Sequence, residues 1–109
     1  MTPFTPVVFH ILAALAGRNR QGYDISKEVL RQTDGQVRMA PGTLYGTLRR
    51  LLDQGWMETV EGQEWADERR RCYRLNGLGR RALEEEVQRM DSRVRTVQTE
   101  PVIPQTARA

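Results

Sequence analysis

The residues that could do chemistry in this chain gather on a predicted helix that begins at Pro41 and ends before Gly55. Proline suits the first helical position, where no N–H is needed, and glycine suits the left-handed residue that follows a helix. Between this proline and this glycine, leucines at helical spacing form one apolar stripe along the helix: Leu44, Leu48, Leu51 and Leu52. The opposite face carries small residues and then two arginines, with Tyr45 at the edge of the stripe: Gly42, Thr43, Gly46, Arg49 and Arg50.

This polar face would suit the major groove of DNA. Slim residues let a helix backbone approach the groove, and arginines reach phosphates or guanine edges. The alternative is an ordinary amphipathic surface helix with solvated arginines, and the helix alone does not decide between them. Tyr23, in the first turn of the preceding predicted helix, could bond a DNA phosphate or could be a core aromatic with its hydroxyl at the surface.

A second basic cluster lies at the base of a predicted hairpin and consists of Arg69, Arg70 and Arg71. Because successive strand residues point to opposite faces, at least one of the three should point outward. The cluster is either a solvated charge run or a set of contacts to the phosphate backbone, and beside a candidate recognition helix we favour the second.

The hairpin tip has the opposite charge, with acidic residues at Glu61, Glu64, Asp67 and Glu68. An acidic tip should be repelled by DNA, so we expect it to stay off the duplex or to be mobile while the arginine base makes contact. The tip also carries Trp65, and the sequence does not choose whether it packs on a strand, lines a cleft or is exposed.

The sequence gives little support for a catalytic site or a metal-binding site. The sequence shows no nucleophile–base pair, no metal-ligand cluster and no phosphate loop, so we expect no enzyme activity, no metal and no cofactor. The one histidine, His10, lies in an apolar run and is better explained as a packed or edge residue than as a ligand. Cys72 lies between arginines, which could make it redox-sensitive, although a plain structural thiol is the simpler interpretation.

Composition sets the class of protein. The chain has 109 residues, 39% of them hydrophobic, which is enough for one compact domain. Its formal net charge of +3 permits a nucleic-acid partner without requiring one. A single cysteine excludes an internal disulfide and points to a reducing cytoplasm. No apolar run approaches the ~20 residues of a membrane span, and no basic residue precedes the apolar N-terminal run, so we expect no membrane and no signal peptide.

The order of predicted elements is that of a winged helix. A helix capped by Thr5 should run from Pro6 to about Ala16 and be followed by a polar connector over residues 17–21. A helix over 22–33, a turn at 34–36 and the helix from Pro41 form a helix-turn-helix. Strands over 56–60 and 69–75 form the hairpin. The predicted fold is therefore mainly α (α+β): a winged helix-turn-helix with a two-stranded wing and a C-terminal dimerisation helix.

The last predicted helix, residues 76–97, has a strict 3.5-residue apolar repeat made of Leu83, Val87, Met90, Val94 and Val97. Such a stripe packs on another helix, most simply across a two-fold axis, or else on the first helix of its own chain. The first helix is apolar on nearly all sides, so we expect one side of it, with Phe9 and Leu12, to face a second subunit. The domains are thus residues 5–75 for DNA binding, 76–97 for dimerisation, and 98–109 as a disordered tail.

These pieces together resemble the PadR family of transcriptional regulators, in its short subgroup with a single C-terminal helix. The resemblance covers roughly residues 9–90 and rests on Ile11-Leu12 with Leu15, Gly22-Tyr23-Asp24-Ile25, Pro41-Gly42-Thr43-Leu44-Tyr45 with Leu48 and Leu51, Gly55-Trp56-Met57, Arg71-Cys72-Tyr73-Arg74-Leu75, and Gly79 with Leu83. It implies a homodimeric winged-helix repressor on a pseudo-palindromic operator in double-stranded DNA, often released by a small aromatic effector. Carried over by position, the DNA-facing residues are Tyr23, Thr43, Tyr45 and Arg49.

The chain departs from that family pattern at three points. Ala40 stands where a serine helix cap is common, at a cost of about 1 kcal/mol in helix stability. The wing tip is acidic, and the last helix lacks the aromatic residue that some relatives stack on a flat ligand. If the protein has an effector pocket, the better candidates to line it are Phe9, Trp56 and Met90. The rival to a DNA-binding regulator is a winged-helix protein-interaction module without specific DNA binding.

Overall fold

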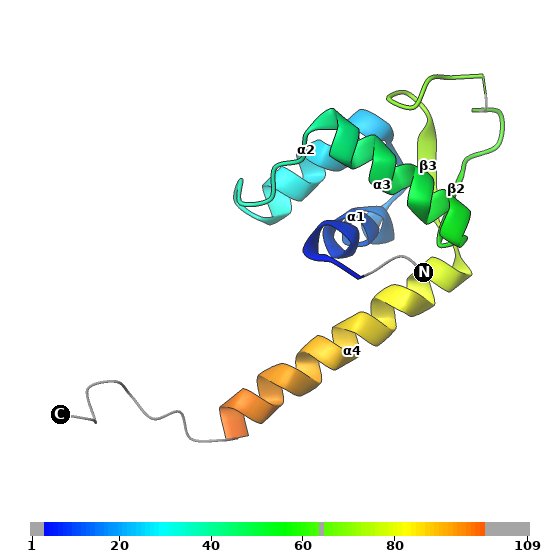
Figure 1. The fold of residues 1–109 in the computed structure, drawn as a ribbon. Coiled ribbons are helices and arrows are strands. Elements are labelled where there is room, and N and C mark those ends of the chain that lie inside the picture. The colour runs from blue at the N-terminus through cyan, green and yellow to red at the C-terminus, as the bar shows by residue number, and fades with distance from the viewer. Residues whose placement is uncertain (1–3, 64, 100–109) are drawn as a thin grey trace.

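A computed structural model describes residues 4–63 and 65–99 of the chain (Figure 1). These residues form four helices and three short strands in the order α1 (Pro6–Gly17), β1 (Arg20–Gln21), α2 (Gly22–Gln32), α3 (Pro41–Gln54), β2 (Met57–Thr59), β3 (Cys72–Leu75) and α4 (Gly77–Thr99). The prediction of a mainly helical α+β winged helix is confirmed.

The two strands of the predicted hairpin are β2 and β3, and the sheet has a third strand, β1, that was not predicted. Its order is β1-β3-β2, all antiparallel, with Arg20 opposite Tyr73 and Met57 opposite Leu75. Residues 17–21 were expected to be only a connector, but Arg20 and Gln21 pair with β3. A strand of two residues is too short to leave an alternating pattern in the sequence.

The predicted helix ends are found where the sequence signals place them. The Thr5 hydroxyl accepts a hydrogen bond from the Val8 N–H at 3.2 Å, and α1 begins at Pro6. Helix α3 begins at Pro41 without a side-chain cap from Ala40 and ends at Gly55, whose φ of 81° is left-handed. Local chemistry therefore sets the start of α1 and both ends of α3.

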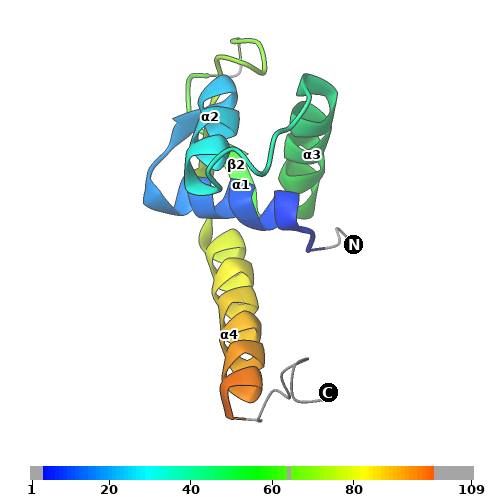
Figure 2. The ribbon, with the colours of Figure 1, turned by 90° about the vertical axis from the view of Figure 1, so that its left-hand side faces the viewer.

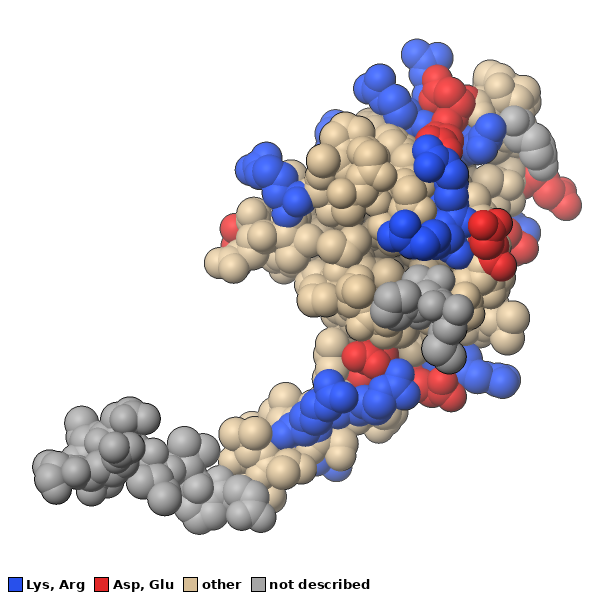
Figure 3. Space-filling view, in the orientation of Figure 1, with Lys and Arg blue, Asp and Glu red and all other residues tan. Residues whose placement is uncertain are grey.

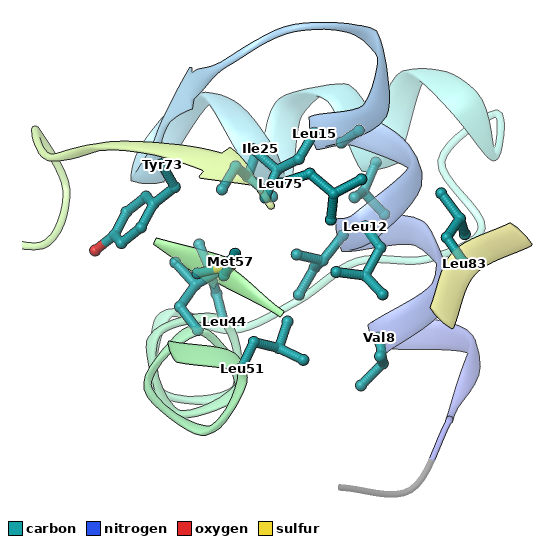
Figure 4. Close-up of a cluster of buried hydrophobic side chains, with 14 residues drawn as sticks. Val8, Leu12, Leu15, Ile25, Leu44, Leu51, Met57, Tyr73, Leu75 and Leu83 are labelled. Atoms are coloured by element: carbon teal, nitrogen blue, oxygen red, sulfur yellow. The ribbon is translucent and has the colours of Figure 1, made fainter. Parts of the chain in front are cut away.

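The core is centred on α1, which α2, the sheet and the first turns of α4 surround (Figure 4). Leu12 is fully buried there, so the expectation that it faces a second subunit is wrong. Leu83 also belongs to this core, which means that the first part of the α4 stripe packs on its own chain. A helix that is apolar on every side gives no sequence signal for which side meets its own core.

Arg20 joins α1 to α2 across the short strand between them. Its Nε donates to the Ala14 carbonyl at 2.8 Å, and its Nη1 lies 3.1 Å from the Asp24 carboxylate. Its Nη2 lies 3.7 Å from Glu28, whose pKa is lowered to about 2, mainly by hydrogen bonds from Arg31. The nearly buried Arg20 thus satisfies an orphan carbonyl at the end of α1 while its charge is balanced by α2.

Helix α4 begins in direct contact with the segment that follows α3. The Asn76 side chain donates to the Gly55 carbonyl at 2.7 Å, and its oxygen caps α4 by accepting from the Gly79 N–H at 2.9 Å. A Cβ at position 79 would collide with the Trp56 carbonyl group and lie 2.7 Å from Leu75 Cδ1. Only glycine therefore allows this approach. Beyond the contact, α4 extends away from the body of the molecule (Figures 1 and 2).

The sequence predicts a disordered tail over residues 98–109. Gln98 and Thr99 belong to α4, and residues 100–109 lie outside the described part of the chain. Among the helices described, none has the length and apolar character needed to cross a membrane.

We predict that Gly79→Ala lowers the free energy of unfolding by about 1–3 kcal/mol, because the added methyl group overpacks the contact with Trp56. Gly77→Ala is the matched control in the same helical turn. Nothing lies within 4 Å of its added Cβ, so it should be neutral or stabilise by up to ~1 kcal/mol. Urea unfolding at one protein concentration measures both values. Equal effects of the two variants would show that the Gly79 contact is not tight in solution.

Candidate nucleic-acid interface

The outward face of α3 matches the one predicted from its sequence. Gly42, Thr43, Arg49 and Arg50 are exposed, whereas the leucine stripe turns inward. No atom lies within 4 Å of a Cβ built on Gly42, so this end of the helix is slim and open. Helix α3 lies on the outside of the molecule, as a helix must to enter a groove of DNA (Figure 1).

Three of the predicted DNA-facing residues, Tyr23, Tyr45 and Arg69, meet in one open groove between α2, α3 and the hairpin. The groove measures about 430 Å³ and is also lined by Ser26, Met39, Pro41 and Leu44. The Tyr45 phenol can donate a hydrogen bond at neutral pH, and partial burial raises its pKa further. Tyr23 is 40% exposed, and the Lys27 ammonium lies 5.0 Å from its ring centre.

The hairpin is held against α2 at a second tight glycine contact. The Gly22 N–H donates to the Arg71 carbonyl and the Tyr23 N–H to the Arg69 carbonyl, both at 3.1 Å. A Cβ on Gly22 would collide with the Glu68 carbonyl. The free N–H groups at the start of α2 are thus satisfied by the arginine run itself, which fixes that run beside Tyr23.

The three arginines lie in a turn ahead of β3, so the expectation that they alternate along a strand is wrong. The Asp67 carbonyl accepts from the backbone N–H groups of Arg70 and Arg71, which closes the turn. The Arg69 and Arg70 side chains are exposed, and with Tyr23 and Asp67 they line a hollow of about 190 Å³. Arg71 instead turns back, and its Nε donates to the Ala66 carbonyl at 2.7 Å.

Arg49 forms an ion pair with Glu68, a residue of the hairpin far from it in the sequence. Its Nε and Nη2 donate to the two oxygens of Glu68 at 2.7 and 3.2 Å. Glu68, one of the acidic residues expected to stay off the duplex or to be mobile, therefore contacts α3. Arg50, on the other flank of the helix, donates to the Thr47 hydroxyl at 3.1 Å. Figure 3 shows basic and acidic side chains interleaved over this part of the surface.

Other residues near this face carried no recognisable pattern in the sequence. Arg38 is exposed in the loop just ahead of α3, and Lys27 lies over Tyr23. Asp53 is exposed on α3 one turn beyond Arg49. Glu68 could not be paired with Arg49 from the sequence, because 19 positions separate them. Only the closure of the hairpin onto α3 brings them together.

The remaining residues singled out in the sequence lie apart from this face. Trp65 is 83% exposed, and Cys72 is half-buried on β3 opposite Gln21. Phe9 and Met90, expected near an effector pocket, do share a groove of about 420 Å³ between α1 and α4, with Glu86 and Arg93 at its edge. Trp56 contacts Phe4 instead, with 5.6 Å between the ring centres.

His10, Phe9's neighbour, is half-buried, and its ring meets that of Phe9 edge-on at 5.2 Å. Within residues 4–63 and 65–99 there is no group of three His, Cys, Asp or Glu residues that could hold a metal ion. The charged and aromatic residues around α3 are therefore the main candidate site.

Comparison with known proteins gives a consistent picture. The model of the transcriptional regulator PadR-like family matches residues 11–85. Transcriptional regulator Rv3488 of Mycobacterium tuberculosis is 37% identical over 92 residues, which make up 84% of this chain and 81% of that protein.

Solved structures agree with the fold. A transcriptional regulator from Clostridium thermocellum superposes with a TM-score of 0.69 at 26% identity, over 84% of this chain and 86% of that one. Bacillus subtilis PadR, solved in complex with operator DNA, superposes with a TM-score of 0.65 over 95% of this chain and 52% of its own. It is 19% identical, so this second likeness shows the fold alone.

We predict that the exposed and the turned-back arginines of the hairpin differ in their effect on DNA binding. Arg69→Ala and Arg70→Ala should each lower the slope of log affinity against log salt by about one unit, because each removes a phosphate contact. Arg71→Ala is the matched control: it should leave the slope unchanged and lower the melting temperature, since its side chain holds the Ala66 carbonyl. Fluorescence anisotropy over a salt series measures the slopes. A loss of slope in Arg71→Ala would show that this side chain turns to the DNA in the complex.

Proposed function

Because the chain belongs to the PadR-like family of transcriptional regulators, we propose that it is a homodimeric repressor that binds a pseudo-palindromic operator in double-stranded DNA. The observation that carries this proposal is the open, slim face of α3 with Arg69 and Arg70 of the hairpin beside it. The small residues allow the backbone of α3 to enter the major groove, while the hairpin arginines lie where phosphates would pass. The structure of PadR with operator DNA supports this placement by likeness of fold.

Within this proposal the residues have distinct roles. Gly42, Thr43 and Gly46 allow close approach, Arg49 and Arg50 read bases or phosphates, and the two tyrosines donate hydrogen bonds to the backbone. Tyr45 can do so from the open groove that it shares with Tyr23. Arg69 and Arg70 supply sequence-independent attraction.

Dimerisation is supported by the apolar residues that α4 leaves uncovered. Val87, Val94 and Val97 are 45%, 52% and 60% exposed, although they continue the stripe that begins with the buried Leu83. Such residues at a 3.5-residue spacing pack against another helix. A second copy of α4, with Met90 and Phe9 at the margin, would cover them and produce a two-fold dimer.

A groove beside that surface suits a small-molecule effector. Phe9 and Met90 supply apolar walls, and Glu86 and Arg93 supply charges at the rim. A ligand bound there would contact α1 and α4 together, and so could favour one arrangement of the dimer over another. We place the protein in the cytoplasm, where its one thiol stays reduced.

The second candidate function is that of a protein-interaction module. The observation that favours it is the pairing of Arg49 with Glu68, which reduces the positive charge available on α3. Exposed charges that are already paired attract phosphate less strongly.

Selection of duplexes from a random pool by the purified chain tests the two functions against each other. We predict that one symmetric sequence is enriched, and that Arg50→Ala weakens binding to it by ~1–3 kcal/mol if this residue reads a base. The melting temperature of Arg50→Ala should stay close to wild type, because its side chain is exposed. Enrichment of no sequence at moderate salt would favour the interaction module.

We predict that Val94→Asp converts the protein to a monomer, because it places a charge in the apolar stripe of α4. Gln88→Asp is the control, since it adds the same charge to an exposed position on the opposite side of the helix. Sedimentation velocity distinguishes the two states. A dimer that persists in Val94→Asp would place the interface elsewhere.

A further inference from the structure

The pairing of Arg49 with Glu68 leaves one edge of the guanidinium open. A guanidinium carries five N–H donors in a rigid plane and can present two of its edges to bidentate acceptors. Glu68 occupies the edge formed by Nε and Nη2, at 2.7 and 3.2 Å. The edge formed by Nη1 and the second hydrogen of Nη2 points away from the carboxylate. The Arg49 side chain is 62% exposed, so a ligand can reach it.

Glu68 is itself held in place by the body of the protein. Its carbonyl accepts from the Tyr73 hydroxyl at 3.3 Å and lies against the Cα of Gly22, where a side chain would not fit. Tyr73 is a buried residue of β3. The backbone of Glu68 is therefore anchored to the sheet and α2, and its carboxylate pairs with an arginine of a different element, α3.

Stability does not explain this pair well. An ion pair with both side chains partly in water contributes ~0–1 kcal/mol to folding. At the same time a carboxylate beside α3 weakens the attraction for phosphate. What the pair does supply is orientation, because a two-point contact fixes both the position and the plane of a long, flexible side chain.

We propose that Glu68 determines specificity by holding Arg49 so that its open edge meets O6 and N7 of one guanine in each half-site. This inference rests on the proposed function. Two acceptors of guanine in the major groove match two parallel N–H donors of arginine. An arginine that is already oriented loses less side-chain entropy on binding, and its fixed plane cannot turn to suit the acceptors of another base, so it discriminates better between guanine and the other bases.

The competing view is that Glu68 merely blocks Arg49 and is displaced by DNA. The two views differ in what removal of the carboxylate does. If it orients Arg49, its loss lowers the preference for one guanine. If it competes with DNA, its loss tightens binding to every duplex by one factor and leaves the order of preference unchanged.

The experiment uses the full chain and the duplex that it selects from a random pool. Dissociation constants are measured for that duplex and for versions in which each guanine in turn is replaced, with wild type, Glu68→Gln, Glu68→Ala and Arg49→Lys. The matched control is Glu58→Gln, which removes the same charge from an exposed pair with Arg74, 2.8 Å apart, that does not involve α3. Circular dichroism melts establish that each variant is folded.

We expect wild type to discriminate against replacement of one guanine in each half-site by about fivefold or more. That factor should fall toward one in Glu68→Ala and Arg49→Lys, fall partly in Glu68→Gln, and stay the same in Glu58→Gln. An unchanged factor in the Glu68 variants, or a uniform gain in affinity for all duplexes, overturns the inference.

If Glu68→Ala does not fold, the isosteric Glu68→Gln decides. If wild type selects no sequence, the proposed function fails, and this outcome is distinct from a selective wild type whose Glu68 variants are equally selective.

Discussion

The close contact of α4 with the residues that follow α3 is the constraint on which the rest of the structure depends. Asn76 bonds the Gly55 carbonyl and caps α4, while Gly79 lies against the Trp56 carbonyl where no larger residue fits. The start of α4 and the residues that follow α3 are therefore in direct contact, so a rearrangement of α4 would act on the end of α3.

The hairpin depends on a similar device at the other end of the molecule. Gly22 lets the arginine turn approach the start of α2, and the N–H groups there bond the carbonyls of that turn. This contact places Arg69 and Arg70 beside Tyr23 and brings Glu68 within reach of Arg49. Gly79 and Gly22 each lack a side chain where another backbone segment comes close. Gly79 thereby allows α4 to pack on the helical body, and Gly22 allows the arginine turn to do so.

The helix ends and the inward face of α3 could be predicted from the sequence, because they depend on residues close together in the chain. Pro41 and Gly55 mark the ends of α3, Thr5 and Asn76 cap their helices, and leucine spacing gives the inward face of α3. Contacts between distant residues could not be read in this way. The strand at Arg20 has only two residues, which is too short for a pattern. Glu68 comes close to Arg49 only when the hairpin folds onto α3. The side of α1 on which Leu12 is buried could not be predicted, because that helix is apolar on all sides.

The length of α4 has a mechanical consequence. Beyond Met90 the residues of α4, positions 91–99, are all exposed, so none of them belongs to the core formed by the described residues. At 1.5 Å per residue its 23 residues span about 34 Å, and a tilt of about 5° at its first turn moves the far end by about 3 Å. This displacement is close to the rise of one base pair along a DNA strand, about 3.4 Å. Because α4 is anchored at one end, ångström-scale repacking near Gly79 would move its far end by about the distance between neighbouring base pairs of a duplex.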